Sequence, residues 1–148
     1  MKTDPNIYKK NMEALMQRYP DLALMLNLVK IEKYQLFQHE NCIPNVMVNG
    51  VPYYVGNMMK YCEEQFRGFK CSNAKIPIFC GAGLFYEVLY WLQFKAKEHQ
   101  TQAVMIFEKD LELFQCAMNV TDLTPLLNNP QIHFFVGIPL DQLYIKLR

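Results

Sequence analysis

The chain has 148 residues, a formal net charge of +1, and 51% hydrophobic against 20% charged residues. This length suits one domain, and the composition excludes a disordered chain, because apolar residues are plentiful and the net charge is close to zero. It also argues against a nucleic-acid-binding protein, since 15 basic residues balance 14 acidic ones and only Arg18, Arg67 and Arg148 are arginines.

The cysteines and the absence of long apolar runs indicate a cytoplasmic protein with no membrane partner. The N-terminus lacks the apolar core of a secretory signal, and no apolar run approaches the roughly 18 residues of a membrane span. The five cysteines form no CxxC pair, and their odd number is typical of reduced thiols. They are Cys42, Cys62, Cys71, Cys80 and Cys116.

Two helices are expected at the start of the chain. Asp4-Pro5 is a typical helix start, because Asp accepts from free N–H groups of the first turn and Pro needs no N–H there. Pro20 then ends this helix or begins the next. The segment from Leu22 to Val29 is apolar on nearly every side, so we expect it to be sandwiched in the core or covered by a partner. With the surplus of Met and aromatic residues, it also hints at an interface of a homo-oligomer.

A β-hairpin is predicted in the middle of the first half. A strand-like stretch begins at Tyr34, and the β-rich runs Asn45–Val48 and Val51–Val55 flank Asn49-Gly50. Asn-Gly between β-formers is the strongest short hairpin signal, because a type I′ turn needs positive φ at both positions. Residues 57–70 then return to helical spacing, and 71–75 form a polar break.

The second half predicts parallel β-α-β units. Apolar runs at Ile76–Cys80, Ala103–Phe107 and Ile132–Val136 alternate with helical patterns over Leu84–His99 and Leu111–Met118. The expected fold class is α/β, a Rossmann-like half-sheet of three parallel strands in order 3-2-1 with crossover helices, preceded by helices and a β-hairpin. Residues 1–75 and 76–148 are expected to make up one compact domain of a longer protein.

The last ten residues predict the opening of a further helix. Leu140, Leu143, Tyr144 and Leu147 lie at helical spacing. In an alternating sheet such a helix leads to another strand, so we expect an N-terminal piece of a longer protein or a minimal domain that docks on another. The alternative is a terminal helix that packs back on the domain.

The order strand, Gly-x-Gly, helix, strand, acidic residue predicts a ligand site at the carboxyl ends of the strands. Gly81 and Gly83 would let the backbone approach a ligand, and the following helix would present free N–H groups. Glu108, with Asp110 nearby, could accept from a ribose hydroxyl, and Gly137 falls at the same edge. A nucleotide or S-adenosylmethionine is the possible ligand, and no cofactor is assigned beyond this.

Simpler interpretations of the same residues remain open. A Gly-x-Gly after a strand can be a plain tight turn, and the third glycine of the dinucleotide fingerprint is replaced by Tyr86. Phe85 is bulky where a phosphate would lie. Glu108 and Asp110 could be an exposed strand end and a helix N-cap, and Glu87 is expected to be solvated.

No metal site and no catalytic residue are predicted. His39, His99 and His133 show no metal-ligand spacing apart from the loose pair of His39 and Cys42. Cys80, at the end of the first apolar run, is expected to be a small buried residue, because no basic partner is identifiable.

Five segments stand in a characteristic order along the chain. They are Asn11–Leu22 (NMEALMQRYPDL), Gly81–Tyr86 (GAGLFY), Phe107–Phe114 (FEKDLELF), Asp122–Leu127 (DLTPLL) and Ile132–Gly137 (IHFFVG). Together they resemble the N-terminal domain of the motility accessory factor (Maf) family of flagellin glycosyltransferases. Their order and spacing match over nearly the whole chain. One departure is Phe85, where the family pattern has glycine.

The resemblance implies a multi-domain cytoplasmic enzyme of bacteria that carry a flagellum. The family transfers a nonulosonic acid from a CMP donor to Ser or Thr of flagellin, through a central sialyltransferase-like domain that follows the segment seen here. The family's catalytic residues are therefore not placed on this chain, which is expected to be inactive alone. The implied partners are flagellin and the C-terminal domains of the same protein. Alternatives are a nucleotide- or S-adenosylmethionine-binding domain and a protein-interaction module.

Overall fold

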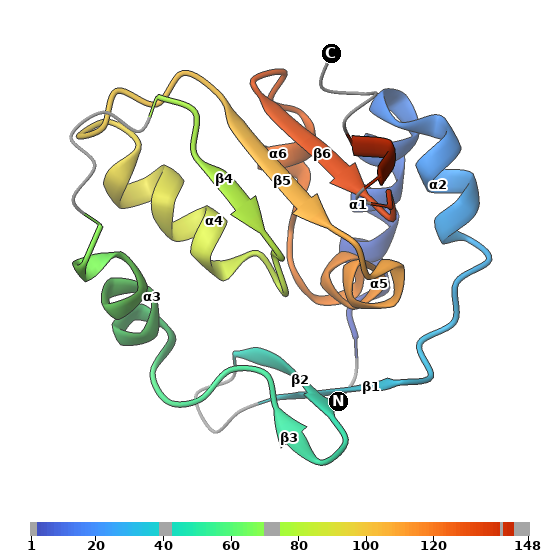
Figure 1. The fold of residues 1–148 in the computed structure, drawn as a ribbon. Helices are drawn as coiled ribbons and strands as arrows, with labels where there is room; N and C mark the ends of the chain where they lie inside the picture. Colours follow the sequence, from blue (N-terminus) through green and yellow to red (C-terminus); the bar gives the residue numbers. More distant parts are fainter. Residues whose placement is uncertain (1–2, 39–42, 70–74, 140, 144–148) are drawn as a thin grey trace.

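The computed structural model describes residues 3–38, 43–69, 75–139 and 141–143. It contains a small antiparallel sheet and a parallel sheet, each of three strands, together with helices that pack on the parallel sheet (Figure 1). The predicted α/β class with a Rossmann-like half-sheet, preceded by helices and a hairpin, is confirmed.

Two helices open the chain, α1 (Pro5–Arg18) and α2 (Pro20–Leu26). The carboxylate of Asp4 accepts from the backbone N–H of Asn6 at 2.9 Å, which confirms the predicted cap. Pro20 is the first residue of α2. This helix exposes Leu24, Met25 and the following Leu28, so the expectation that it is sandwiched in the core is wrong.

The predicted hairpin is confirmed. Strand β1 (Tyr34–Gln38) pairs antiparallel with β2 (Pro44–Val48), which pairs with β3 (Val51–Pro52). Asn49 and Gly50, with φ of 52° and 75°, form the turn that their sequence predicted. The last strand is shorter than predicted, because the backbone bends at Tyr53 and Tyr54. Helix α3 (Met58–Arg67) follows.

The parallel sheet has the order β4-β5-β6, as predicted. Its strands are β4 (Ile78–Cys80), β5 (Val104–Glu108) and β6 (Ile132–Val136). Between them lie α4 (Tyr86–Tyr90), the π-helix η1 (Trp91–Lys95), α5 (Leu111–Val120) and α6 (Thr124–Leu127). The single helix expected over 84–99 is thus corrected, because Leu84 and Phe85 belong to the preceding turn and the helix widens at Trp91.

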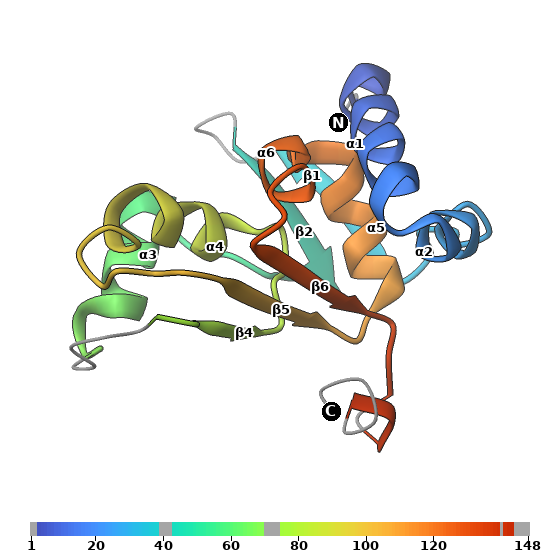
Figure 2. The same cartoon turned by 90° about the horizontal axis from the view of Figure 1, so that it is seen from above.

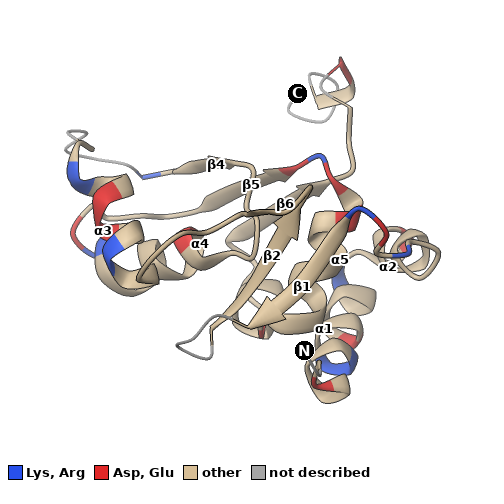
Figure 3. Ribbon diagram, turned by 90° about the horizontal axis from the view of Figure 1, so that it is seen from below, with Lys and Arg blue, Asp and Glu red and all other residues tan. Residues whose placement is uncertain are grey.

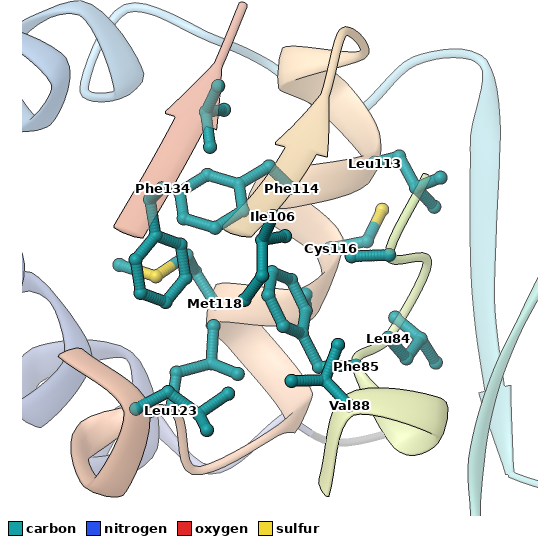
Figure 4. Packing of buried hydrophobic residues seen from close by; sticks show 14 of the residues in the cluster. Leu84, Phe85, Val88, Ile106, Leu113, Phe114, Cys116, Met118, Leu123 and Phe134 are labelled. Carbon is teal, nitrogen blue, oxygen red and sulfur yellow. The ribbon is translucent and has the colours of Figure 1, made fainter. Parts of the chain in front are cut away.

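One hydrophobic core joins the two halves of the chain. Ile106 of β5 and Phe134 of β6 point towards the helices and meet Phe85 and Phe114 there (Figure 4). The ring of Phe85 lies 5.9 Å from each of the rings of Phe114 and Phe134. Leu15 and Leu26 of the first two helices belong to the same core.

Two polar side chains of α1 fasten it to the second half. The buried amide of Asn11 donates to the carbonyls of Met118 and Thr121 at 2.9 and 2.7 Å and accepts from the N–H of Leu123 at 2.9 Å. Arg18 donates to the carbonyl of Asn129 at 2.7 Å. The segment Asn11–Leu22 therefore supplies donors and acceptors to the backbone at the end of α5 and after α6.

In the described part of the chain, the parallel sheet has one covered and one bare face. Both α4 and α5 lie on the same side of it, and of the described residues Figure 2 shows on the other side only the turn that follows β6. Ile78 and Cys80 are exposed on the edge strand β4, and Phe107 and Phe135, stacked at 4.7 Å, are half-buried. Charged residues lie at the carboxyl end of β5 and not in β4 or β6 (Figure 3). Cys80 was expected to be buried, and this is corrected, because none of the described elements covers it.

Two sequence-based predictions reach beyond the described residues. Of the predicted terminal helix, the structure describes Asp141–Leu143 as helical, and Leu140, Tyr144 and Leu147 lie outside the described part. His39, Cys42 and Cys71 also lie outside it. Within the described ranges, no helix is long and apolar enough to cross a membrane, and no three His, Cys, Asp or Glu residues gather as metal ligands.

Candidate functional site

The five residues of the predicted ligand site come together at the carboxyl ends of the parallel strands. The turn after β4 runs through Gly81 and Gly83 with positive φ of 86° and 54°. The N–H of Gly81 donates to the carbonyl of Phe107 at 2.7 Å, and that of Gly137 donates to the carbonyl of Glu108 at 2.8 Å. The turn, the end of β5 and the end of β6 are thus joined in one network.

The carboxylate of Glu108 fills the position where this turn could bind an anion. One oxygen accepts from the N–H groups of Ala82 at 2.9 Å and Gly83 at 3.4 Å, and the other accepts from the N–H of Asp110 at 3.0 Å. Glu108 is 3% exposed. The alternative of an exposed strand end is wrong for this residue, because its side chain turns inward onto the glycine turn.

Tyr54 closes the same turn from the hairpin side. Its hydroxyl oxygen accepts from the N–H of Leu84 at 2.8 Å, and its side chain is buried. A Cβ at Gly83 would lie 2.2 Å from this oxygen, so glycine is required here by the close approach of the ring. Burial raises the pKa of the Tyr54 phenol, which therefore stays neutral.

The hairpin covers the carboxyl end of the parallel sheet (Figure 1). The Tyr34 hydroxyl donates to the carboxylate of Asp110 at 2.5 Å, and the ammonium of Lys33 lies 3.4 Å from the same oxygen. Glu112 accepts from the backbone N–H groups of Glu32 and Lys33. In open α/β sheets this end is the usual place of ligands, and here the chain's own hairpin occupies it.

Asp110 acts as the N-cap of α5, as the alternative interpretation predicted. Its carboxylate accepts from the N–H groups of Glu112 at 3.0 Å and Leu113 at 3.2 Å. Partial burial disfavours the ionised form, but hydrogen bonds from Tyr34, Leu113 and Lys33 outweigh it and lower the pKa of Asp110. Its oxygens already have protein partners.

Phe85 has a structural role in the turn. It adopts the left-handed conformation with φ of 70°, which L-residues rarely adopt and glycine adopts without strain. The buried ring compensates for the strain by filling the core between Phe114 and Phe134.

The structure also shows the surroundings of three further residues that the sequence analysis discussed, Tyr86, Glu87 and Gly137. Tyr86 donates from its hydroxyl to the carbonyl of Pro44 at 2.6 Å and thereby ties α4 to the hairpin. Glu87 is half-buried rather than solvated, and burial raises its pKa. A Cβ at Gly137 would lie 2.9 Å from the side chain of Leu111, so this glycine allows close packing of β6 on α5.

Sequence reasoning missed Tyr54 and Tyr34, the two residues that close the site. They lie 20 or more residues before the glycine turn, and no spacing rule connects a hairpin tyrosine with a later Gly-x-Gly. The N–H groups from Gly81 to Phe85 all have partners inside the protein, the last being the carbonyl of Ala82 at 2.7 Å. The arrangement builds a closed turn, and nucleotide binding there stays a prediction.

Comparison with known proteins gives the family. Residues 7–84, more than half of the chain, match the family model described as the glycosyltransferase Maf N-terminal domain. The chain belongs to this family. The predicted resemblance to Maf proteins is thereby confirmed, and the matched range includes the segments Asn11–Leu22 and the first residues of the glycine turn.

A solved Maf structure has the same fold. The chain is similar to the Maf glycosyltransferase from Magnetospirillum magneticum AMB-1, with a TM-score of 0.66 and 15% sequence identity over 97% of this chain. It spans 29% of the length of that protein. None of the curated proteins compared with the chain matches it.

Proposed function

We propose that this chain is a non-catalytic N-terminal domain of a cytoplasmic Maf glycosyltransferase. The whole enzyme would transfer a nonulosonic acid from a CMP donor to Ser or Thr of flagellin in a bacterium with a flagellum. The observation that carries the non-catalytic role is the closed turn, in which Glu108 and Tyr54 accept the N–H groups that a nucleotide would need. The reaction would belong to domains that this chain does not contain.

The bare face of the parallel sheet supports a role as one part of a larger assembly. Parallel sheets in globular proteins are normally covered on both faces. Here α4 and α5 cover one face (Figure 2). Among the described residues, the exposed Ile78 and Cys80 and the half-buried Phe107 and Phe135 belong to the other face. The remaining domains of the same enzyme are the proposed partner of this face, with flagellin as the acceptor.

A transfer assay tests the proposal directly. The chain is incubated with a CMP-activated nonulosonic acid and flagellin, and a complete Maf glycosyltransferase serves as the positive control. We expect modified flagellin, detected by mass spectrometry, with the complete enzyme and none with the chain alone. Transfer by the chain alone would contradict the non-catalytic role.

A second candidate is a homo-oligomerising interaction module, favoured by the apolar surface of α2. Leu24 of α2 is 59% exposed and Leu28, in the turn that follows this helix, is 83% exposed, so two large apolar side chains lie on the surface close together in sequence. Light scattering over a range of protein concentrations distinguishes the candidates. A dimer that dissociates in the variant Leu28→Gln supports the module, and a monomer at every concentration removes it.

A further inference from the structure

The two edges of the parallel sheet differ in what meets their backbone. Strand β6 forms one edge and β4 forms the other. The N–H and C=O groups of successive residues in a strand point to opposite sides, so each edge strand carries one row of groups that its neighbour does not use. What occupies this outer row decides whether a further strand can pair there.

Side chains from the junction of α1 and α2 occupy the outer row of β6. The hydroxyl oxygen of Tyr19 accepts from the N–H of Phe134 at 3.2 Å, and the guanidinium of Arg18 donates to the carbonyl of Ile132. The alternate row faces β5, from which the carbonyl of Gln131 accepts at 3.0 Å. A further strand beside β6 would have to displace Tyr19 and Arg18.

The outer row of β4 is open among the described residues. The carbonyl of Pro77 and the N–H of Gly81 bond to β5 at 3.0 and 2.7 Å. The groups of Ile78 and Cys80 alternate with these, so they point to the free edge, where no described strand pairs with them. The side chain of Ile78 is 58% exposed, and β4 carries no charged residue of the kind that usually protects an edge. This edge is therefore available to a strand.

The bare face of the sheet adjoins this open edge. The rings of Phe107 and Phe135 stack there with centres 4.7 Å apart and are half-buried. No Lys, Arg, Asp or Glu belongs to β4 or β6 (Figure 3). Because a parallel sheet normally has a helix on each face, this uncharged face is suited to the apolar side of a helix.

The handedness of the crossovers determines how the chain can reach the open edge. The strands follow one another in the order β4-β5-β6, and both α4 and α5 lie on one face (Figure 2). Connections between parallel strands are right-handed almost without exception. A connection from β6 to the far side of β4 steps across the sheet in the opposite direction. It must therefore cross the opposite face, which is the bare one.

The backbone leaves β6 on that bare side. Gly137, with φ of 66°, turns the chain, and the helical residues Asp141–Leu143 lie on the side away from α4 and α5 (Figure 2). The N–H of Gln142 donates to the carbonyl of Pro139 at 3.0 Å, which is the bond of a tight helical turn. The chain thus starts in the direction that a right-handed return to β4 requires.

We propose that a later segment of the same enzyme completes this sheet from the bare side. It would lay the apolar side of a helix on Phe107 and Phe135 and add a strand parallel to β4, paired with the backbone of Ile78 and Cys80. The inference rests on the proposed function, in which this chain is one domain of a longer enzyme. It specifies where that enzyme's next segment binds, which is at the edge of β4 and not at that of β6.

Two substitutions of Ile78 test the edge pairing. Ile78→Pro removes the N–H that points to the free edge, whereas Ile78→Val keeps this N–H and a similar side chain. Proline is tolerated in edge strands, and the preceding Pro77 has the extended backbone that a following proline favours. In the chain alone, both variants should therefore unfold at nearly the same urea concentration. A much lower midpoint for Ile78→Pro would show that the edge is already in use.

The thiol of Cys80 reports on the same edge in the complete enzyme that contains this domain. Its reaction with a disulfide reagent is followed by mass spectrometry of the Cys80 peptide. We expect the reaction to be at least about tenfold slower in the complete enzyme than in the chain alone, because a paired strand must open first. Ile78→Pro should react about tenfold faster than Ile78→Val in the complete enzyme, since a buried carbonyl loses its donor. A cysteine introduced by Lys97→Cys, at an exposed position away from β4, should react equally in both proteins.

Three outcomes would overturn the proposal. Equal reaction of Cys80 in both proteins would show that nothing covers the edge. Protection that is the same in Ile78→Pro and Ile78→Val would show a cover without strand pairing. Protection in the chain alone that grows with protein concentration would show that a second copy fills the edge. No sugar transfer is measured, so failure here leaves the transfer assay unaffected, and transfer by the chain alone would contradict the proposed function without changing the reactivity of Cys80.

Discussion

The carboxylate of Glu108, at the end of β5, accepts a hydrogen bond of 2.9 Å from the backbone N–H of Ala82, in the turn that follows β4. This contact puts a negative charge of the protein itself at the glycine turn. Turns of this kind bind phosphates because their N–H groups are free and point at the ligand. In this chain the same N–H groups hold two parallel strands together at their carboxyl ends.

Replacing Glu108 tests the structural role of its carboxylate. In Glu108→Gln an NH₂ group must face at least one of the N–H groups that the carboxylate now accepts, so a buried donor loses its acceptor. We expect the free energy of unfolding, measured by urea denaturation, to fall by about 1–3 kcal/mol. The control Glu64→Gln, on the exposed side of α3, should change it by less than about 0.5 kcal/mol. Equal effects would show that the inward carboxylate does not stabilise the turn.

Two substitutions of Phe85 separate the effect of its backbone strain on stability from the effect of burying its ring. Phe85→Ala and Phe85→Gly both remove the buried ring and should each destabilise the fold by about 3–5 kcal/mol. Because φ is 70°, the glycine variant should be the more stable of the two by about 1 kcal/mol. The pair Val88→Ala and Val88→Gly, inside α4, should show the opposite order. An alanine preference at both positions would contradict the left-handed conformation.

The lowered pKa of the Asp110 carboxyl group predicts how the stability of the fold changes with pH. The folded state lowers the pKa of this carboxyl below its ordinary value of about 3.9, so the ionised group stabilises the fold above that value. The contribution is lost as the pH falls through the unfolded pKa towards the folded one. We expect the difference in unfolding free energy between the unmodified chain and Asp110→Asn to be constant above about pH 5 and to shrink below about pH 4.

The matched variant for this test is Tyr34→Phe, which removes the hydroxyl that donates to Asp110 at 2.5 Å. In that background the pH-dependent part of the Asp110→Asn effect should be smaller, because one interaction that lowers the pKa is gone. Curves for Asp110→Asn and the unmodified chain that stay parallel down to acid pH would show that the carboxylate is not stabilised by folding.

The thiol of Cys80 reports on the bare face of the sheet. In a background with Cys42→Ala and Cys71→Ala, Cys80 is exposed whereas Cys62 and Cys116 are buried. Burial raises the pKa of Cys62 to about 11 and that of Cys116 to about 12, which leaves little thiolate at neutral pH. A disulfide reagent should therefore react with the Cys80 thiol at least about 100-fold faster than with the thiols of Cys62 and Cys116. Slow reaction of all three would mean that another element covers the face of β4.

Local signals in the sequence were sufficient for much of the fold. Asn49-Gly50 predicted the hairpin because its backbone angles are available to few other residue pairs. The run Ile132–Val136 matched β6 to the residue, since Asn129-Pro130 and Gly137 delimit it. The Asp4 cap and the strand order followed from similarly local or topological rules.

The sequence predicted which residues meet at the candidate site, but not which side chains fill it. Gly81, Gly83, Glu108, Asp110 and Gly137 do meet, because parallel strands end at one edge of the sheet. What fills that edge depends on Tyr54 and Tyr34, whose positions arise from the packing of a distant hairpin. The π-helix at Trp91 was equally invisible, because its residues have the same apolar spacing as an α-helix.

Calorimetric titration of the chain with CMP, NAD and S-adenosylmethionine tests the central claim most directly. If Glu108 and Tyr54 satisfy the turn from within, none of the three ligands should give saturable heat up to about 1 mM. The same titrations of the variant Glu108→Gln, which lacks the negative charge, test a turn that no longer repels an anion. Saturable binding to the unmodified chain, abolished by Gly83→Ala, would contradict the account and restore a nucleotide site at the glycine turn.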